Sequence, residues 1–524
     1  MTRMKAGRVP EGKVPWDLIA DRLTGALPPE VLLGPGPGED AALVRIGGEV
    51  WAVASDPISF TATDAGRLSV LVNANDVAVR GARPRFFVAV VLVAPDEATD
   101  DRVREILAEI RSTCEGLGIV LIGGHTEVTP GLAHSMVIGT MLGRVAERPI
   151  TTGGLRRGDW IGMTKWAGLE GTSILLGEFG ERLRAIHASD AFRPPDEVLA
   201  GDWLSVVPEA ALAAGVPGVS ALHDVTEGGV GEALFELSRA SGQEIEVSAE
   251  AIPVLPETQR LCEELGIDPL GLIGSGAMLV GCGAESKDEL EARLRERGIA
   301  FTWIGRAVAP GTARSAAVPR FERDEILKAW LLEAVRAVIF DMDGTLIDAE
   351  YDWPGIRETL EITGPSILDQ LHGLPEPERK EKWELLHEIE RRATRGATLK
   401  PGAVELLALL REQQKPTALV TNNTSENTTF LLERFGLTFD VVITRDSGQW
   451  KPAAGPMEQA IQRLGMEPEQ CFAVGDSILD LIAARKAGCG RVCAVYGGAV
   501  RHGHEADISF QDLTALLRYL RIVL

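Results

Sequence analysis

The sequence predicts a multidomain protein that combines α/β and α+β architecture, and three observations carry this prediction. The chain has 524 residues, which is too long for one ordinary hydrophobic core. Short apolar runs typical of strands, such as residues 50–54 and 87–93, alternate with helical patterns, such as residues 101–117. After a small, polar stretch at residues 310–319, the same alternation starts again abruptly at Ala337.

This organisation predicts two halves joined by a linker. In the first half we expect two subdomains, residues 1–150 and 151–310, because a glycine-rich turn precedes a new strand at that boundary. Residues 311–333 form the expected linker. Residues 334–524 are expected to form a doubly wound, Rossmann-like α/β domain, since their continuous apolar runs suit strands that are buried on both faces. A charged helical stretch at about 349–400 is expected to be a small inserted cap.

Composition and charge exclude some classes of partner. The formal net charge is −23, which argues against nucleic acid or an anionic membrane surface as a main partner. The longest apolar stretch is Phe86–Ala94, far shorter than the roughly 20 residues of a membrane-spanning helix. The six cysteines are scattered and form no CxxC pair, as expected for reduced thiols in the cytoplasm. We therefore expect a cytoplasmic protein.

Polar side chains follow the predicted strands of the second half at the points where each strand ends. They are Asp341 and Asp343 in DMDGT, Thr421 in VTNN, Lys451 before a proline, and Asp476 and Asp480 in GDSILD. Because the carboxyl ends of parallel strands meet at one edge of the sheet, we expect these side chains to form a single site. Phosphoryl transfer requires an in-line nucleophile, a metal ion and positive groups around the developing charge.

In order and spacing, these four motifs resemble those of the haloacid dehalogenase superfamily, over residues 335–524. The stretch DMDGTLID at residues 341–348 is similar to that of phosphoglycolate-phosphatase-like members with a small helical cap. The resemblance implies that Asp341 is the nucleophile and Asp343 the general acid and base, and the second aspartate favours a phosphatase over a dehalogenase. Thr421 and Lys451 would hold the phosphoryl oxygens. The implied Mg²⁺ ligands are Asp341, Asp343, Asp476 and Asp480.

In the first half, carboxylates and glycines accompany several predicted strands and helices. The segments concerned are GEDAA at 38–42, SDP at 55–57, NANDVAV at 73–79, GGHTE at 123–127 and HDVTEGG at 223–229. Asp76 lies in an apolar helical stretch, and a buried carboxylate needs a cation as partner. Glycine-rich strand-to-helix turns let backbone amides approach an anion. No GxxxxGK[ST] loop occurs, so these features favour a different kind of Mg²⁺–ATP site.

Together these segments, with GSGA at 274–277, resemble the aminoimidazole ribonucleotide synthetase superfamily over about residues 30–310. That superfamily includes thiamine-monophosphate kinase and the hydrogenase-maturation carbamoyl dehydratases, and the GGHTE and HDVTEGG segments look most like the latter. The resemblance implies a homodimer through the N-terminal half, with ATP and Mg²⁺ as ligands. The implied metal ligands are Asp40, Asp76 and Asp224. The implied nucleotide-binding residues are Asp40, Asp56, Asn75, Asp76, Gly123, Gly124, His125, Asp224, Gly228 and Gly229.

Three readings of the function remain open from sequence. The first is a bifunctional enzyme, in which one half uses ATP as a synthetase or kinase and the other removes phosphate from a small phosphorylated metabolite. The second is a phosphatase fused to a non-catalytic ATP-binding sensor or dimerisation scaffold. The third is a hydrogenase-maturation-like protein, although that branch ends in a tail with a reactive cysteine and this chain ends in Arg521–Leu524.

Overall fold

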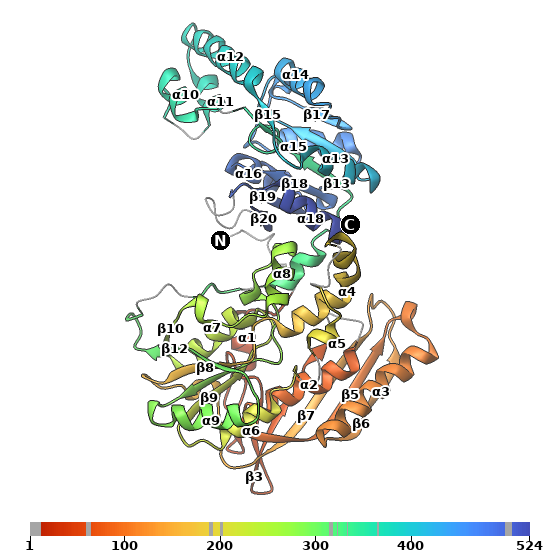
Figure 1. Ribbon diagram of the computed structural model, residues 1–524, viewed down its shortest axis with the longest axis vertical. Coiled ribbons are helices and arrows are strands. Elements are labelled where there is room, and N and C mark those ends of the chain that lie inside the picture. The colour runs from red at the N-terminus through yellow and green to blue at the C-terminus, as the bar shows by residue number, and fades with distance from the viewer. Residues whose placement is uncertain are drawn as a thin grey trace. The chain divides into compact units, whose positions relative to one another are not determined.

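The computed structural model describes residues 12–58, 64–187, 192–199, 203–313, 318–321, 323–332, 334–349, 351–363, 366–497 and 506–524. The chain divides into two compact units, and the division falls close to residue 328 (Figure 1). Sheets and helices mix in both units, so the predicted α/β and α+β multidomain fold is confirmed. None of the described helices is both long and apolar enough to cross a membrane.

The first sheet of the N-terminal unit follows the strand order β1-β2-β3-β7-β5-β6, and β4 also pairs with β7. Its strands are β1 (Val31–Leu33), β2 (Ala42–Ile46), β3 (Glu49–Ala54), β4 (Pro57–Ile58), β5 (Ala82–Val93), β6 (Val120–Val128) and β7 (Met136–Val145). Helices α2 (Ala65–Ala78) and α3 (Asp100–Leu117) lie against this sheet (Figure 1). α2 is buried almost all round, as its continuous apolar sequence requires.

A second, antiparallel sheet follows in the same unit, with the order β10-β12-β8-β11-β9. Its strands are β8 (Trp160–Thr164), β9 (Val219–Asp224), β10 (Glu244–Val247), β11 (Met278–Cys282) and β12 (Phe301–Val308). The accompanying helices are α4 (Leu169–His187), α5 (Pro195–Val198), α6 (Val207–Ala214), α7 (Gly229–Ser241), α8 (Pro256–Leu265) and α9 (Lys287–Glu296). Helix α1 (Trp16–Leu23) precedes the first sheet.

The C-terminal unit contains a fully parallel sheet in the order β17-β16-β13-β18-β19-β20. Its strands are β13 (Ala337–Phe340), β16 (Thr417–Val420), β17 (Val441–Ile443), β18 (Cys471–Gly475), β19 (Arg491–Val495) and β20 (Ile508–Phe510). The accompanying helices are α13 (Ala403–Glu412), α14 (Ser425–Phe435), α15 (Gly455–Leu464), α16 (Ile478–Lys486) and α18 (Leu513–Val523). β13, β16 and β18 are buried at every residue, which explains their uninterrupted apolar sequences.

A helical insertion follows β13 and forms the cap. It consists of α10 (Trp353–Leu360), α11 (Ile367–Gly373) and α12 (Glu378–Gly396), whose apolar side chains share a small core of their own. The chain enters and leaves the cap through two short antiparallel strands, β14 (Ile347–Asp348) and β15 (Thr398–Leu399). Lys400 also pairs with Asp348 across this neck, with 2.8 Å between Nζ and Oδ2.

Part of the predicted linker between the units is helical. Within the predicted linker the structure has one 3₁₀ helix, η6 (Glu325–Trp330), among the described residues. Asp324, just before it, is buried and accepts the backbone N–H groups of Gly228, Ile273 and Ile326 at 2.6, 3.2 and 2.8 Å. These hydrogen bonds attach this part of the linker to the subdomain that contains the second sheet.

Candidate active site and carboxylate cluster

Asp341 stands at the carboxyl end of the central strand β13, where the sheet positions it. Its backbone N–H donates to Val474 O of β18 at 3.0 Å, so the parallel ladder extends to the residue itself. The chain then turns at Gly344, whose φ of +92° favours glycine. A Cβ at this position would lie 2.4 Å from Asp476 Oδ2, so the glycine also lets the two loops approach each other closely.

Lys451 provides the positive charge among these carboxylates. Its Nζ lies 2.5 Å from Asp341 Oδ1 and 2.5 Å from Asp480 Oδ1, and it also donates to Val420 O at 2.8 Å. The lysine is 2% exposed. Burial favours its neutral form, but Asp341 and Asp480 outweigh burial and raise its pKa. The ammonium group therefore stays charged and can stabilise negative charge beside Asp341.

Asp476 and Asp341 retain oxygens that suit a divalent cation. Asp341, Asp476 and Asp480 each place one carboxylate oxygen within 4.8 Å of the others. Asp480 already accepts from Lys451 and from Ser477, whereas Asp476 accepts from Thr345 through Oδ1 only, among the described residues. Burial, followed by repulsion from Asp480, raises the pKa of Asp476 to about 6 and that of Asp341 well above its usual range. Hard oxygen donors that repel one another fit Mg²⁺, with Asp480 as a supporting residue.

Asp343 lies in the same cavity, but its carboxylate is not part of this group of ligand atoms. It accepts from Asn423 Nδ2 at 3.1 Å and from Thr421 Oγ1 at 3.3 Å, because the chain has already left the strand and turned toward the loop after β16. The expectation that this carboxylate is a metal ligand therefore stays a prediction, and its contacts here suit proton transfer. Burial, more than any charge nearby, raises the pKa of Asp343 to about 6, which suits a group that gives and takes a proton near neutral pH.

These residues line one cavity of about 370 Å³ between the sheet edge and the cap. The catalytic and metal residues predicted for the C-terminal half all border it: Asp341, Asp343, Thr421, Lys451, Asp476 and Asp480. The cap contributes Tyr351, Trp353, Ile367, Leu368 and Leu386. Glu390 on α12 and Arg445 on the core form a buried, two-pronged ion pair, with 2.6 Å between each pair of atoms. The cap is thus closed over the predicted nucleophile.

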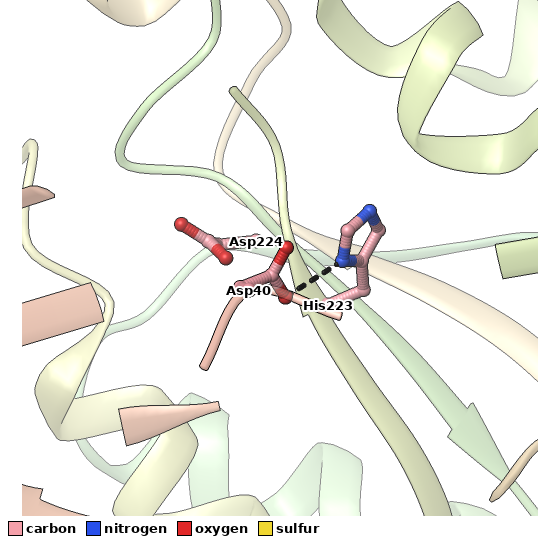
Figure 2. A group of neighbouring side chains, drawn as sticks. All are labelled: Asp40, His223 and Asp224. Carbon is pink, nitrogen blue, oxygen red and sulfur yellow. Dashed lines mark hydrogen bonds and ion pairs between the residues drawn. The ribbon is translucent and has the colours of Figure 1, made fainter. Parts of the chain in front are cut away.

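The N-terminal unit gathers a second set of carboxylates between its two sheets. Asp40 lies just before β2, Asp76 near the end of α2, and Asp224 at the end of β9, close to Asp40 and His223 (Figure 2). Burial raises the pKa of Asp76 well above its usual range, and repulsion from Asp56, Asp224 and Asp40 adds to the effect. The structure therefore brings together the four aspartates that the resemblance implied.

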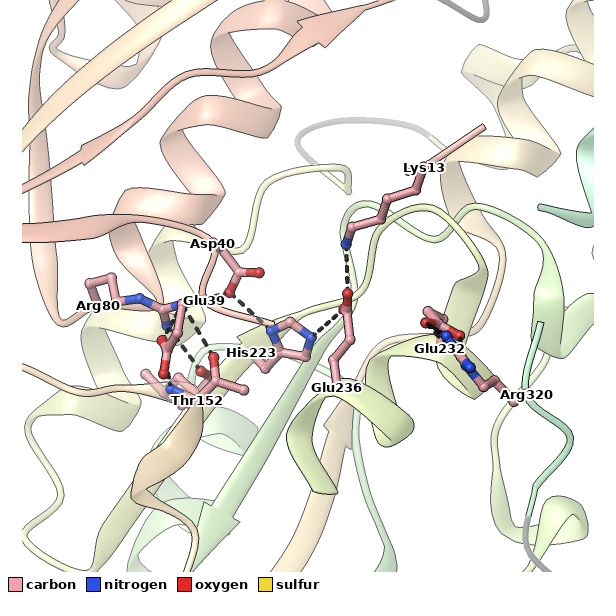
Figure 3. Close-up of polar contacts among 10 residues, drawn as sticks. Lys13, Glu39, Asp40, Arg80, Thr152, His223, Glu232, Glu236 and Arg320 are labelled. Atoms are coloured by element: carbon pink, nitrogen blue, oxygen red, sulfur yellow. Dashed lines mark hydrogen bonds and ion pairs between the residues drawn. The ribbon is translucent and has the colours of Figure 1, made fainter. Parts of the chain in front are cut away.

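Arg80 and His223 are buried cations that contact Asp40 (Figure 3). Arg80 is fully buried and lies 3.0 Å from both Glu39 Oε2 and Asp40 Oδ2. His223 joins Asp40 to Glu236, with 2.9 Å at Nδ1 and 3.2 Å at Nε2. Burial opposes charge on His223, but the two carboxylates raise its pKa to about 10. Both ring nitrogens are thus engaged, and the ring acts as a cation rather than a metal ligand.

Arg80 and His223 also act to lower the pKa of Asp224, but they do not offset its burial. Within the described part of the chain, Asp76 Oδ2 and both carboxylate oxygens of Asp224 are buried without a hydrogen-bond partner. Burial first, and then repulsion from Asp40, raises the pKa of Asp224 to about 8. A buried carboxylate without a partner is costly, and a divalent cation would remove that cost. The donor set at Asp76 and Asp224 therefore fits Mg²⁺.

Three of the predicted nucleotide-binding residues make hydrogen bonds to other parts of the protein. Asn75 donates to Leu204 O and accepts from Val206 N, both at 2.8 Å, so it holds that segment instead of a ligand. Gly228 N donates to Asp324 Oδ2, and Gly229 N donates to Thr226 O at 3.1 Å. The predicted anion-binding turn is thus occupied by the linker's own carboxylate.

The GGHTE segment forms part of a strand. Gly123, Gly124 and His125 lie within β6, where every residue is exposed and His125 pairs with Glu127 at 3.1 Å. A Cβ at Gly124 would lie 1.8 Å from Ala89 O of β5, so this glycine permits close pairing of the strands. These residues face solvent and are apart from the buried carboxylates.

Sequence reasoning missed the buried cations that balance the N-terminal cluster. Arg80 directly follows NANDVAV, and a charge in that context was the available signal. His223 precedes Asp224, and the sequence alone favours a core histidine there. Asn423, two residues after Thr421, gave no signal of its own, because its contacts with Asp343 and the cap depend on tertiary structure.

Comparison with known proteins assigns a family to each half. Residues 38–145 and 156–316 match the N-terminal and C-terminal domains of AIR synthase related protein, and residues 338–495 match haloacid dehalogenase-like hydrolase. The carbamoyl dehydratase HypE of Rhodobacter capsulatus is 31% identical over 309 residues, which cover 57% of this chain and 87% of that protein. The phosphoglycolate phosphatase of Chromobacterium violaceum is 30% identical over 213 residues, covering 35% of this chain and 96% of the relative.

Among solved structures, the hydrogenase maturation protein HypE of E. coli aligns with a TM-score of 0.43 at 25% identity, over 52% of this chain and 87% of that one. The predicted fusion is confirmed by the matches of the two halves to separate families. The chain therefore belongs to the AIR synthase-related family through its N-terminal half and to the haloacid dehalogenase-like hydrolases through its C-terminal half.

Proposed function

We propose that the chain is a bifunctional cytoplasmic enzyme, whose C-terminal half is an Mg²⁺-dependent phosphatase acting on a small phosphorylated metabolite. The observation that carries this proposal is the pairing of Asp341 with Lys451 at 2.5 Å inside a cavity that also contains Asp343, Thr421 and Asp476. A nucleophile, a proton donor, an ammonium group and metal ligands thus meet at one place. The phosphatase relative of this half supports the same chemistry.

The proposed reaction has two steps. In the first, an oxygen of Asp341 bonds to phosphorus while the bond from phosphorus to the leaving oxygen breaks, and Asp343 gives its proton to that oxygen. In the second, Asp343 takes a proton from water as the water attacks phosphorus, and the bond between phosphorus and Asp341 breaks. Lys451 and Thr421 stabilise the phosphoryl oxygens. Mg²⁺ held by Asp341 and Asp476 would neutralise further charge.

The test of the phosphatase is phosphate release from a panel of small phosphate esters, with Mg²⁺, by the wild type and by Asp341→Asn. The wild type is expected to hydrolyse at least one ester, and Asp341→Asn to lose that activity. Trapping of a phosphorylated wild-type protein would add direct evidence for the intermediate. Hydrolysis that survives in Asp341→Asn would contradict the assignment.

For the N-terminal half we propose an Mg²⁺–ATP site at Asp40, Asp56, Asp76 and Asp224. The supporting observation is the set of buried carboxylate oxygens at Asp76 and Asp224 that lack protein partners among the described residues. ATP binding should be weakened in Asp76→Asn and retained in Asp341→Asn. An unchanged dissociation constant for ATP in Asp76→Asn would rule out this site, and binding without turnover would favour the scaffold reading.

We also propose that the protein is a homodimer through the N-terminal half. The edge strand β6 is exposed along its whole length, including Val120, Ile122 and Val128 at 54, 55 and 53%. An apolar edge of this kind is a template for pairing with a second copy. Sedimentation of the wild type beside Ile122→Lys tests this: the variant should become monomeric, and a monomeric wild type would contradict the dimer.

A further inference from the structure

Asn423 lies in the loop between β16 and α14, and the orientation of its side-chain amide is fixed. Its Oδ1 accepts the backbone N–H of Thr424 at 2.8 Å and Nδ2–H of Asn427 at 3.0 Å. The residue is 3% exposed. Because both donors form hydrogen bonds to the oxygen, the NH₂ group points away from them and toward the cavity.

That NH₂ group contacts the core and the cap at once. One contact is with Asp343 Oδ2 at 3.1 Å, and the other is with the Tyr351 hydroxyl at 3.2 Å. An amide nitrogen has two hydrogens, so it can donate to both acceptors together. Tyr351 precedes the first cap helix, whereas Asp343 follows β13, so a single amide group joins the cap to the predicted proton donor.

The cap side of this contact is itself held in place. The Tyr351 ring stacks on Trp353 with 4.6 Å between ring centroids. Farther along the cap, Glu390 binds Arg445 through two bonds of 2.6 Å, and the same arginine donates to Asn422 O at 3.2 Å. With the cap in this position Tyr351 contacts Asn423, and a cap that moved away would remove one of the two acceptors of the Asn423 NH₂ group.

We propose that Asn423 is a positioning residue that orients Asp343 for proton transfer to the leaving oxygen, and that it does so fully only when Tyr351 of the closed cap is in contact. This inference rests on the proposed phosphatase function. The contact would couple the closed position of the cap to the orientation of Asp343. Proton transfer and exclusion of water would then occur in the same closed state.

The proposal makes a prediction that depends on the leaving group. An alkyl phosphate releases a basic alkoxide and needs the proton from Asp343, whereas p-nitrophenyl phosphate releases a stable phenolate and needs it little. The parameter to compare is kcat/KM, because it reports phosphoryl transfer to Asp341 and not the later hydrolysis common to both esters. A residue with a merely structural role would lower both values equally.

The experiment compares both esters, with Mg²⁺, in the wild-type full chain and in three variants. The alkyl phosphate is the one that the wild type hydrolyses fastest. Asn423→Ala is expected to lower kcat/KM about 10²-fold for the alkyl ester and less than about 5-fold for p-nitrophenyl phosphate. Tyr351→Phe should change the ratio in the same direction by a smaller factor. Ser425→Ala is the matched control, because Ser425 lies two residues after Asn423 while its hydroxyl contacts Thr444, which follows β17, and its ratio should equal that of the wild type.

Each other outcome has a definite meaning. Equal losses for both esters in Asn423→Ala would overturn the positioning role. An unchanged ratio in Tyr351→Phe would overturn the link to the cap. Should Asn423→Ala fail to fold, shown by its thermal midpoint, Asn423→Ser takes its place in the same comparison. A wild type without activity on either ester would instead refute the proposed phosphatase, and no ratio would then exist for any variant.

Discussion

The two halves of the chain both bury aspartates, but they balance the negative charge differently. In the C-terminal half, Lys451 lies between Asp341 and Asp480 and compensates both. In the N-terminal half, Arg80 and His223 compensate Asp40 from one side, and Asp76 and Asp224 retain buried oxygens without partners in the described residues. The second arrangement leaves more negative charge for external cations.

Within the N-terminal cluster, the pKa values of neighbouring carboxylates shift in opposite directions. Burial opposes ionisation of Asp40, yet His223 and Arg80 lower its pKa to about 2, whereas the pKa of nearby Asp224 rises to about 8. A charged and an uncharged carboxylate thus lie side by side in the absence of metal. The N-terminal cluster therefore leaves a carboxylate for a bound cation. In the C-terminal cluster, Lys451 already neutralises part of the negative charge.

The largest expected effect follows from removal of that lysine. Lys451→Met should lower kcat/KM for phosphate esters by about 10²–10³-fold, because the transition-state charge loses its ammonium partner. Steady-state kinetics with Mg²⁺ measures the loss. Activity within a factor of two of wild type would show that the metal alone balances this cluster, which would remove the contrast between the halves.

The corresponding change in the N-terminal half is Arg80→Met, which leaves Glu39 and Asp40 buried without their arginine. We expect it to lower the free energy of unfolding by about 3–5 kcal/mol. Denaturant unfolding followed by fluorescence measures this change. The exposed ion pair of Arg391 with Glu388 provides the control, since Arg391→Met should cost no more than about 1 kcal/mol. Equal costs for the two variants would contradict the role of Arg80.

Divalent cations should stabilise the N-terminal cluster. Mg²⁺ at about 100 times its dissociation constant is expected to raise the free energy of unfolding by about 2.7 kcal/mol, and a chelator should reverse the effect. Asp224→Asn should lose most of this gain, because it removes the negative charge and replaces one of the two unpartnered oxygens with an NH₂ group. Asp476→Asn changes the other cluster and serves as the comparison. An undiminished gain in Asp224→Asn would place the cation elsewhere.

A pH-dependent effect is expected at Asp324, which is held by backbone N–H groups in place of a cation. Burial raises its pKa from 3.8 to about 7. The folded state therefore binds the proton more tightly than the unfolded state, so stability should fall as pH rises from about 4 to about 7, by up to about 4 kcal/mol. Thermal midpoints against pH should show this fall in the wild type. Asp324→Asn should lack this component, and an identical slope in both proteins would contradict it.

Much of the C-terminal half could be predicted from sequence because its strands are buried on both faces. Such strands read as apolar runs that end in polar residues, so Asp341, Thr421 and Asp476 mark the sheet edge directly. Contacts between distant segments leave no such local pattern. The pairing of Glu390 with Arg445, and the use of Gly228 N by Asp324, arise only when separate elements dock. The nucleotide contacts predicted at the glycines of β6 stay predictions, because glycine permits close approach to a ligand and close approach to a neighbouring strand equally well.

The neck of the cap has a consequence for how such a protein can change over time. Ile347 pairs with Leu399, and Asp348 with Thr398, so the points where the chain leaves and re-enters the sheet domain are neighbours on adjacent strands. Adjacent strands lie about 4.8 Å apart. The whole segment between them can therefore be lengthened, shortened or replaced without moving the ends of β13 or α13. The cap is in this sense an exchangeable module, and selectivity can diversify while Asp341 and its surroundings stay constant.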